Sequence, residues 1–240
     1  MTYEVKGAKL VELPFLEHHL SDRSATDNVL VVGEQVGAEG IIQTVVKVGF
    51  DRILCTDIMP LEPKSELDNI ISERQNVKFI QHDFVEFPED ESFQYIVCIN
   101  VLEHFGMNYA EFHGFSGALS GDDYIRWNHD LRAIRKMIGL LKKNKKAKII
   151  ITVPCGQPLY SGDLNTGNKM PMLRRYDIVR INLIKQLIQE SNMSIKETFY
   201  ITEDFETWYE TDDSISTPQF AHLQNPYSPN GLWAFTITSI

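Results

Sequence analysis

Glycine and acidic residues recur just after short apolar segments of this 240-residue chain. The segment NVLVVG, residues 28–33, leads into a turn that contains Gly33 and Gly37. Glycines between a strand and a helix let a ligand approach the backbone closely. Asp57 follows the next apolar segment, about 20 residues later, where a carboxylate can accept hydrogen bonds from ribose hydroxyls. The alternative for Asp57 is that it caps the N-terminus of a helix.

Two later apolar segments are also followed by residues with useful chemistry. Asp83 and Phe84 come after residues 77–81; a carboxylate can accept a hydrogen bond from an adenine amino group, and a neighbouring aromatic ring can cover the base. His104 and His113 are the two candidates for a general base, since histidine exchanges protons near neutral pH. The alternatives are that His104 braces a helix and that His113 packs within a loop.

The elements that must position these residues alternate between strands and helices. Strands are expected at 28–33, 52–56, 77–81, 93–99, 147–153 and 232–239. Helices are expected at 38–48, 65–73, 123–141 and 178–190. Short apolar runs that alternate with helices are typical of a parallel, doubly wound sheet, in which ligands bind beyond the carboxyl ends of the strands. The pattern predicts one α/β domain over residues 1–240.

Three long irregular segments are expected to form the substrate end of the molecule. They are residues 105–124, 157–176 and 203–231. Irregular segments of this length inside a compact domain are usually functional. Arg174 and Arg175 could pair with a phosphate or carboxylate of a substrate, and we place Tyr160 and Tyr176 beside them as candidate contacts. The alternative for the arginines is a pair of surface salt bridges at the start of the following helix.

The charge of the chain disfavours a nucleic-acid partner. Its formal net charge is −10, which repels phosphate backbones. The lysine-rich run 142–148 lies between a helix and a strand, and we interpret it as a solvated helix end. No apolar stretch is long enough to span a bilayer, and residues 1–15 lack the apolar run of a signal peptide. We therefore expect a cytoplasmic protein that binds neither nucleic acid nor membrane.

The three cysteines are expected to be free thiols in a reducing compartment. Cys55, Cys98 and Cys155 lie in or just after apolar runs, and they lack metal-ligand spacing. We expect no metal site on this basis, although Asp122, Asp123, His129 and Asp130 leave metal dependence open. The oligomeric state is not determined by the sequence, and a homodimer is one arrangement that it allows.

The ordered set of segments resembles the class I S-adenosylmethionine-dependent methyltransferases. NVLVVGEQVG is similar to their glycine-rich first motif, ILCTDIMP to their second strand with its ribose-binding acid, and VKFIQHDF to their third strand with an adenine-side acid. YIVCINVLEHF, AKIIITVPCG and GLWAFTITS are similar to the fourth, fifth and last strands. The resemblance implies a doubly wound, mostly parallel seven-stranded sheet with an antiparallel last strand and helices on both faces.

The resemblance also implies a cofactor, a reaction and a set of contacts. The cofactor would be S-adenosyl-L-methionine and the reaction methyl transfer to a small-molecule acceptor, such as a sugar, a nucleotide-linked sugar or a small anionic metabolite. The residues that would bind the cofactor are Gly33, Glu34, Gly37, Asp57, Ile58, Met59, Asp83, Phe84, Asn100 and Val101.

Three positions depart from the family pattern. Val31 stands where the family usually has an acid, Gln35 where it usually has a glycine, and Gln94 where it usually has Asp. Glu34 could supply the missing carboxylate for the amino group of the cofactor. The departures leave open a catalytically inactive relative that acts as a partner or scaffold subunit. A nicotinamide-dependent dehydrogenase would need G-x-G-x-x-G, which the glycine spacing in residues 33–40 does not provide.

Overall fold

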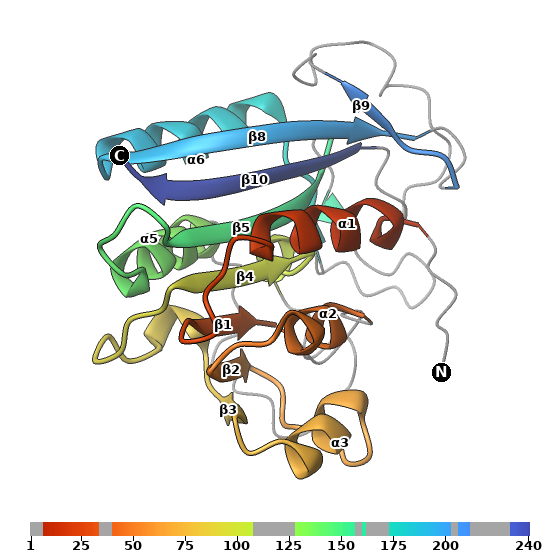
Figure 1. Cartoon of the computed structure of the whole chain (residues 1–240). Helices are drawn as coiled ribbons and strands as arrows, with labels where there is room; N and C mark the ends of the chain where they lie inside the picture. The colour runs from red at the N-terminus through yellow and green to blue at the C-terminus, as the bar shows by residue number, and fades with distance from the viewer. Residues whose placement is uncertain are drawn as a thin grey trace.

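The first strand, β1 (Asn28–Val32), lies inside an eight-stranded mixed sheet. The computed structural model describes residues 7–33, 40–107, 128–156, 160–161, 173–202, 206–211 and 231–240. The sheet has the order β3-β2-β1-β4-β5-β10-β8-β9 (Figure 1). Its other strands are β2 (Arg52–Asp57), β3 (Val77–Gln81), β4 (Tyr95–Ile99), β5 (Lys148–Cys155), β8 (Met193–Ile201), β9 (Tyr209–Thr211) and β10 (Gly231–Ser239).

The strand directions agree with the doubly wound prediction. Strands β1 to β5 run parallel to one another, and the order in which the chain adds strands to the sheet reverses between β1 and β4. Strand β10 runs antiparallel to both β5 and β8, so the expected antiparallel last strand is confirmed. Strand β8 was not anticipated, and the short β9 makes eight strands where seven were expected. The reversal between β1 and β4 is the switch point at which such sheets bind ligands.

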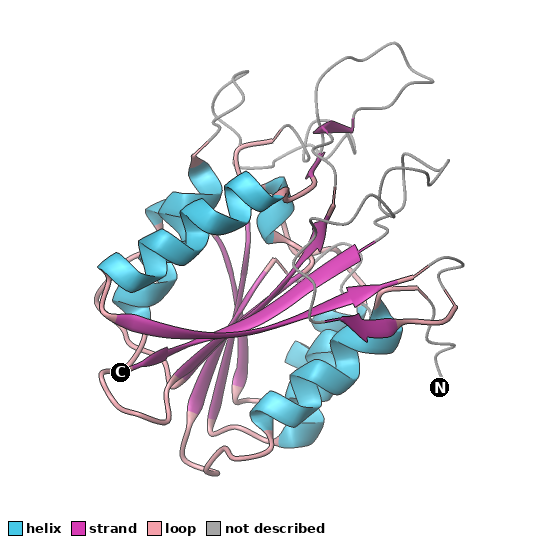
Figure 2. Ribbon diagram, turned by 90° about the horizontal axis from the view of Figure 1, so that it is seen from above, coloured by secondary structure: helices cyan, strands magenta, loops and turns pink. Residues whose placement is uncertain are grey.

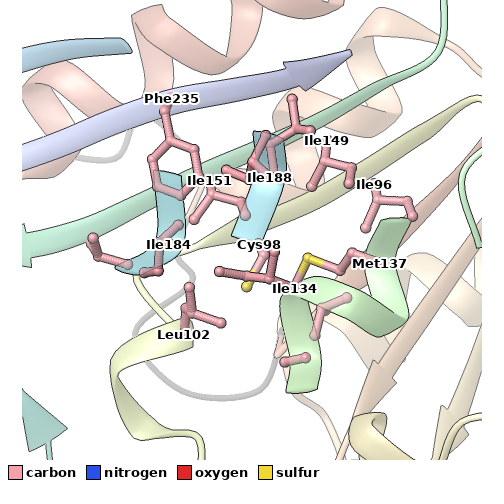
Figure 3. Close-up of a cluster of buried hydrophobic side chains, with 14 of the residues drawn as sticks. Ile96, Cys98, Leu102, Ile134, Met137, Ile149, Ile151, Ile184, Ile188 and Phe235 are labelled. Atoms are coloured by element: carbon pink, nitrogen blue, oxygen red, sulfur yellow. The ribbon is translucent and has the colours of Figure 1, made fainter. Parts of the chain in front are cut away.

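Helices cover both faces of the sheet (Figure 2). Helices α1 (Lys9–Leu20), α2 (Ile41–Val48) and α3 (Glu66–Glu73) pack on one face, where their apolar side chains share a core with β1, β2 and β4. Helices α5 (His129–Leu140) and α6 (Ile178–Glu190) pack on the other. Figure 3 shows this second core, in which Ile134 and Met137 of α5 and Ile184 of α6 meet Ile149 and Ile151 of β5.

Local signals in the sequence explain where two of these helices begin. The Ser65 side chain accepts a hydrogen bond from the backbone N–H of Asp68 at the start of α3. Asp177 does the same for α6, with Arg180 as donor at 2.8 Å. Serine and aspartate are favoured at this position because their side-chain oxygens satisfy N–H groups that the first turn leaves open. The expected helix 178–190 is confirmed at both ends.

The cysteines and the lysine-rich run have the burial that the sequence predicts. Cys55, Cys98 and Cys155 are buried and free, as expected. Lys143 and Lys146, in the lysine-rich run, are exposed after the end of α5. Within the described ranges, no helix has the length and apolar character needed to cross a bilayer.

Candidate functional site

Gly33 and Val101 bring the ends of β1 and β4 into contact. Gly33 has a φ of 76° and donates its N–H to the carbonyl of Thr56 at the end of β2, at 2.8 Å. A Cβ atom at residue 33 would lie 2.2 Å from Val101 Cγ1. Both the positive φ and the lack of space therefore require glycine at this position. Three strand ends meet here, at the edge where a doubly wound sheet binds its ligand.

Asp57 is the last residue of β2 and lies at the same edge. Its Oδ1 accepts a hydrogen bond from the backbone N–H of Met59 at 2.9 Å, which fixes the carboxylate just beyond the strand. The side chain is partly exposed. Because Ser65 caps α3, the alternative that Asp57 caps a helix is wrong. Of the two apolar residues that follow, Ile58 is partly exposed and Met59 is buried.

Asp83 and Phe84 follow β3, next to Asp57. The backbone N–H of His82 donates to the Asp57 carbonyl at 2.8 Å, so the two strand ends are held together. Asp83 Oδ1 accepts from the Val85 N–H at 3.0 Å and caps the short 3-10 helix η1 (Phe84–Glu86). Phe84 is buried, with its ring centroid 6.0 Å from those of Phe87 and Phe105. This structure therefore gives Phe84 a packing role in the core.

The residues after β4 form a tight, polar turn. Asn100 has a φ of 56° and donates its N–H to the Thr152 side-chain oxygen at 3.1 Å. The 3-10 helix η2 (Leu102–His104) follows directly. His104 is partly exposed, and its Nε2 lies 4.0 Å from Oε1 of Glu103. His104 is thus at the ligand edge of the sheet, as expected of a candidate base.

Glu103 is buried beside this histidine, with 1% of its surface exposed. Burial, and to a smaller extent the nearby carboxylate of Glu12, raise the pKa of its carboxyl group to about 8, while a backbone hydrogen bond, Lys9 and Arg174 act to lower it. Its Oε2 atom has no hydrogen-bond partner among the described residues. A buried acid with a strongly raised pKa at a ligand edge is a functional candidate, and the sequence analysis did not single it out.

Helix α1 contributes two charged residues to the same region. Glu12 is fully buried, and its Oε1 accepts a hydrogen bond from the Thr152 hydroxyl at 2.8 Å. Lys9 lies one helical turn earlier, with Nζ 3.1 Å from Glu12 Oε2. No motif around residues 9–12 indicated this role, because Thr152 is 140 residues away along the chain.

A buried ion-pair network holds the turn after β4 in place from the opposite face. Asp130 at the start of α5 is fully buried and pairs with Arg174 Nη1 at 2.7 Å and with Arg180. The Tyr176 hydroxyl lies 3.2 Å from Asp130 Oδ2 and 3.1 Å from the Leu102 carbonyl. Burial, and then the charge of Asp130, raise the pKa of Tyr176 well above its ordinary value.

Arg174 completes the attachment by donating to the Phe105 carbonyl at 2.8 Å. The network therefore binds the backbone on both sides of His104. Arg174 is 3% exposed, so the alternative of a surface salt bridge is wrong for this residue. Arg174 and Tyr176 both have structural partners. The Arg175 side chain is partly exposed, and burial lowers the pKa of its guanidinium group.

Several expected site residues lie outside the described residues. These are Glu34, Gly37 and His113, together with most of the three segments assigned to the substrate end. Tyr160 is described through its backbone pairing with Arg174 in the two-stranded sheet of β6 (Tyr160–Ser161) and β7 (Leu173–Arg174). In the described part of the chain, no group of three or more His, Cys, Asp or Glu residues could hold a metal ion.

Comparison with known proteins depends on structure, since no protein-family profile and no curated protein matches the sequence. The N-methyltransferase NodS of Bradyrhizobium japonicum is 13% identical, with 95% of this chain and 94% of NodS aligned at a TM-score of 0.52. A 1,6-didemethyltoxoflavin-N1-methyltransferase of Burkholderia thailandensis is 11% identical, with 95% and 77% aligned and a TM-score of 0.55. A proposed RNA methyltransferase of Pyrococcus horikoshii is 8% identical, with 97% and 85% aligned and a TM-score of 0.55.

This chain has the class I methyltransferase fold. The two alignments to NodS and to the toxoflavin methyltransferase each cover 95% of this chain, with TM-scores of 0.52 and 0.55. The NodS and toxoflavin-pathway structures were also determined with S-adenosylhomocysteine bound. The three proteins act on different kinds of acceptor by their names, so the class I methyltransferase fold does not identify the acceptor of this chain.

Proposed function

We propose that this protein is an S-adenosylmethionine-dependent methyltransferase with a small-molecule acceptor. The observation that carries the proposal is the meeting of Gly33, Asp57 and Val101 at the switch point of a class I methyltransferase fold. Gly33 leaves no room for a side chain, and Asp57 presents a partly exposed carboxylate at the end of β2. These features fit a nucleoside ligand that lies against the backbone and offers ribose hydroxyls.

The described residues fit S-adenosylmethionine in distinct ways. Asp57 would accept hydrogen bonds from the ribose hydroxyls, and Ile58 would contact the adenine ring. Asp83 would accept from the adenine amino group, while Asn100 and Val101 would line the side that faces the methionine portion. When bound, S-adenosylmethionine supplies a methyl group that is already activated by its sulfonium. The protein then needs to align the acceptor and, where the acceptor carries a proton, remove it.

His104 is the described candidate for that proton transfer. It is partly exposed at the ligand edge, and the hydrogen bonds of Tyr176 and Arg174 to the carbonyls of Leu102 and Phe105 hold its backbone on both sides. A general base must be held within hydrogen-bond reach of the proton it removes, which favours a residue on a braced turn. His113 remains the second candidate.

The acceptor class is supported by charge more than by specific contacts. A net charge of −10 disfavours a phosphate backbone as acceptor. We propose a sugar, a nucleotide-linked sugar or another small anionic metabolite. Arg175, whose side chain is partly exposed, is the proposed contact for an anionic group of the acceptor.

Calorimetric titration of the whole chain with S-adenosylmethionine and S-adenosylhomocysteine tests the cofactor assignment, with NADH as the control. We expect S-adenosylmethionine and S-adenosylhomocysteine to bind with micromolar affinity and NADH not to bind. A screen of candidate acceptors for S-adenosylhomocysteine formation then tests turnover. Binding without turnover on any acceptor class would favour the inactive relative, and NADH binding alone would refute the methyltransferase proposal.

A further inference from the structure

Three buried polar atoms without hydrogen-bond partners gather between α1 and the turn after β4. Among the described residues they are Lys9 Nζ, Glu12 Oε2 and Glu103 Oε2. Lys9 and Glu12 form an ion pair at 3.1 Å that does not have hydrogen-bond geometry, and both residues act electrostatically on Glu103. Buried polar atoms are nearly always hydrogen-bonded, because leaving them unsatisfied costs free energy. Three such atoms in one cluster indicate a binding partner.

The cluster lies beside the proposed cofactor site. Thr152 of β5 donates its hydroxyl hydrogen to Glu12 and accepts the N–H of Asn100, so one side chain separates Glu12 from the first residue after β4. Leu13, the next residue of α1, packs on the other side against the end of the glycine turn, where a Cβ on Gly40 would lie 3.0 Å from its Cδ1. The start of α1 therefore spans the gap between the glycine turn and the β4 turn.

The charges of the cluster fit a ligand that carries both an ammonium and a carboxylate group. Lys9 offers a buried ammonium group at the end of a side chain that is 17% exposed, while Glu12 and Glu103 offer buried carboxyl groups. Strand β1 offers no charged group at this edge, since Val31 is apolar and 1% exposed. The other ionisable groups that interact with Glu103 include Arg174, which is paired with Asp130, the buried thiol of Cys98, the buried hydroxyl of Tyr176 and the His104 ring at 4.0 Å.

We propose that Lys9, Glu12 and Glu103 bind the methionine portion of the cofactor, in place of an acid at the end of β1. The Lys9 ammonium group pairs with the α-carboxylate, and the two glutamates accept from the α-ammonium group. Charge-assisted hydrogen bonds of this kind are the stronger ones in proteins. This inference rests on the proposed function, because it assigns the residues at one end of the same cofactor site.

Two ligands that differ only at this end test the assignment. S-Adenosylhomocysteine carries the amino-acid group, whereas 5′-methylthioadenosine has the same nucleoside and sulfur without it. Calorimetry compares their affinities for the wild-type chain, Lys9→Met and Glu103→Gln. We expect each substitution to lower the affinity for S-adenosylhomocysteine at least about tenfold and to leave the affinity for 5′-methylthioadenosine unchanged. Glu17→Gln is the matched control, since Glu17 lies on the same helix in an exposed pair with Lys47.

Each outcome supports or overturns the inference. Retained 5′-methylthioadenosine binding shows that a variant is folded with its nucleoside site intact. Unchanged S-adenosylhomocysteine affinity in both variants would overturn the assignment and leave the proposed function standing. If the KM for the acceptor were then raised in these variants, the three residues would be assigned to acceptor binding instead. An equal loss of affinity for S-adenosylhomocysteine and 5′-methylthioadenosine would also overturn the assignment. If the wild-type chain binds neither ligand, the proposed function itself fails.

Discussion

Gly33 and Val101 are packed so closely that residue 33 can carry no side chain. A Cβ atom there would lie 2.2 Å from Cγ1, 2.7 Å from Cγ2 and 2.9 Å from Cβ of Val101. Valine is branched at Cβ, which restricts its χ1 rotamers, so it cannot turn away freely. The contact joins the ends of β1 and β4, and it fixes the distance between the glycine turn and the turn that carries His104.

Gly33→Ala is therefore expected to lower both stability and cofactor binding. The substitution introduces the clash with Val101 and also places an L side chain at a φ of 76°. Thermal unfolding and S-adenosylhomocysteine calorimetry measure the two effects. The double variant Gly33→Ala, Val101→Ala removes the two Cγ contacts but keeps the contact with Cβ of residue 101 at 2.9 Å and the φ penalty, so it should recover part of the stability. A single variant with wild-type melting and affinity would contradict the packing described here.

Asp57→Ala is expected to weaken cofactor binding by about 1–3 kcal/mol, because the carboxylate would no longer accept from the ribose hydroxyls. Calorimetry with S-adenosylhomocysteine measures the change. Asp51→Ala is the matched control, since Asp51 is an exposed aspartate just before β2, at the opposite end of the same strand. Equal affinities for the Asp57 variant and the wild-type chain would remove Asp57 from the site.

Asp130→Ala is expected to destabilise the fold by about 3–5 kcal/mol, since it leaves the buried guanidinium of Arg174 without its carboxylate. Chemical unfolding measures the free energy of unfolding. Glu17→Ala removes a carboxylate whose pair with Lys47 is solvated, with side-chain exposures of 48% and 77%, and should cost about 0–1 kcal/mol. Similar losses for the two variants would show that the Asp130 network is not a structural centre.

The sequence was sufficient for the parallel strands because most of them are continuous apolar runs, and each of the five ends at or is followed by a polar or glycine residue. Strand β8 was missed for the opposite reason: its residues Met193–Ile201 are mostly partly exposed and alternate with polar ones. Helix α1 was missed because it contains Pro14 and has little amphipathic character. Helix periodicity and apolar runs are the main local signals, and neither element has them.

The candidate site was predictable only where it follows strand ends. Gly33, Asp57 and His104 were found from their positions after apolar runs. The roles of Glu12 and Gln94 depend on partners far away in sequence. Gln94, a departure from the family pattern, forms a reciprocal amide pair with Asn144, with both distances 2.9 Å. Such pairings are set by tertiary packing, which a single sequence does not display.

The pH dependence of stability provides a test of the buried Glu103 carboxyl group. Its pKa rises from an ordinary value of 4.5 to about 8 in the folded protein, chiefly through burial. Between these values the folded state holds a proton that the unfolded state has lost, so the free energy of unfolding falls as pH rises, by at most about 1.4 kcal/mol per pH unit. Burial, followed by the charge of His18, lowers the pKa of His19 from 6.5 to about 4. Between these two values the free energy of unfolding therefore rises with pH, which is the opposite of the effect of Glu103.

The window from about pH 7.5 to about pH 8 therefore separates Glu103 from His19, because His19, with a pKa of 6.5 in the unfolded chain and about 4 in the folded protein, is mostly neutral in both states there. Chemical unfolding across this window should show falling stability for the wild-type chain and a flatter profile for Glu103→Gln, which has no proton to lose. The difference between the two profiles removes the contribution of other titrating groups. Glu17→Gln, an exposed glutamate on α1, should keep the wild-type slope. Parallel profiles for the wild-type chain and Glu103→Gln would mean that Glu103 is ionised in the folded protein.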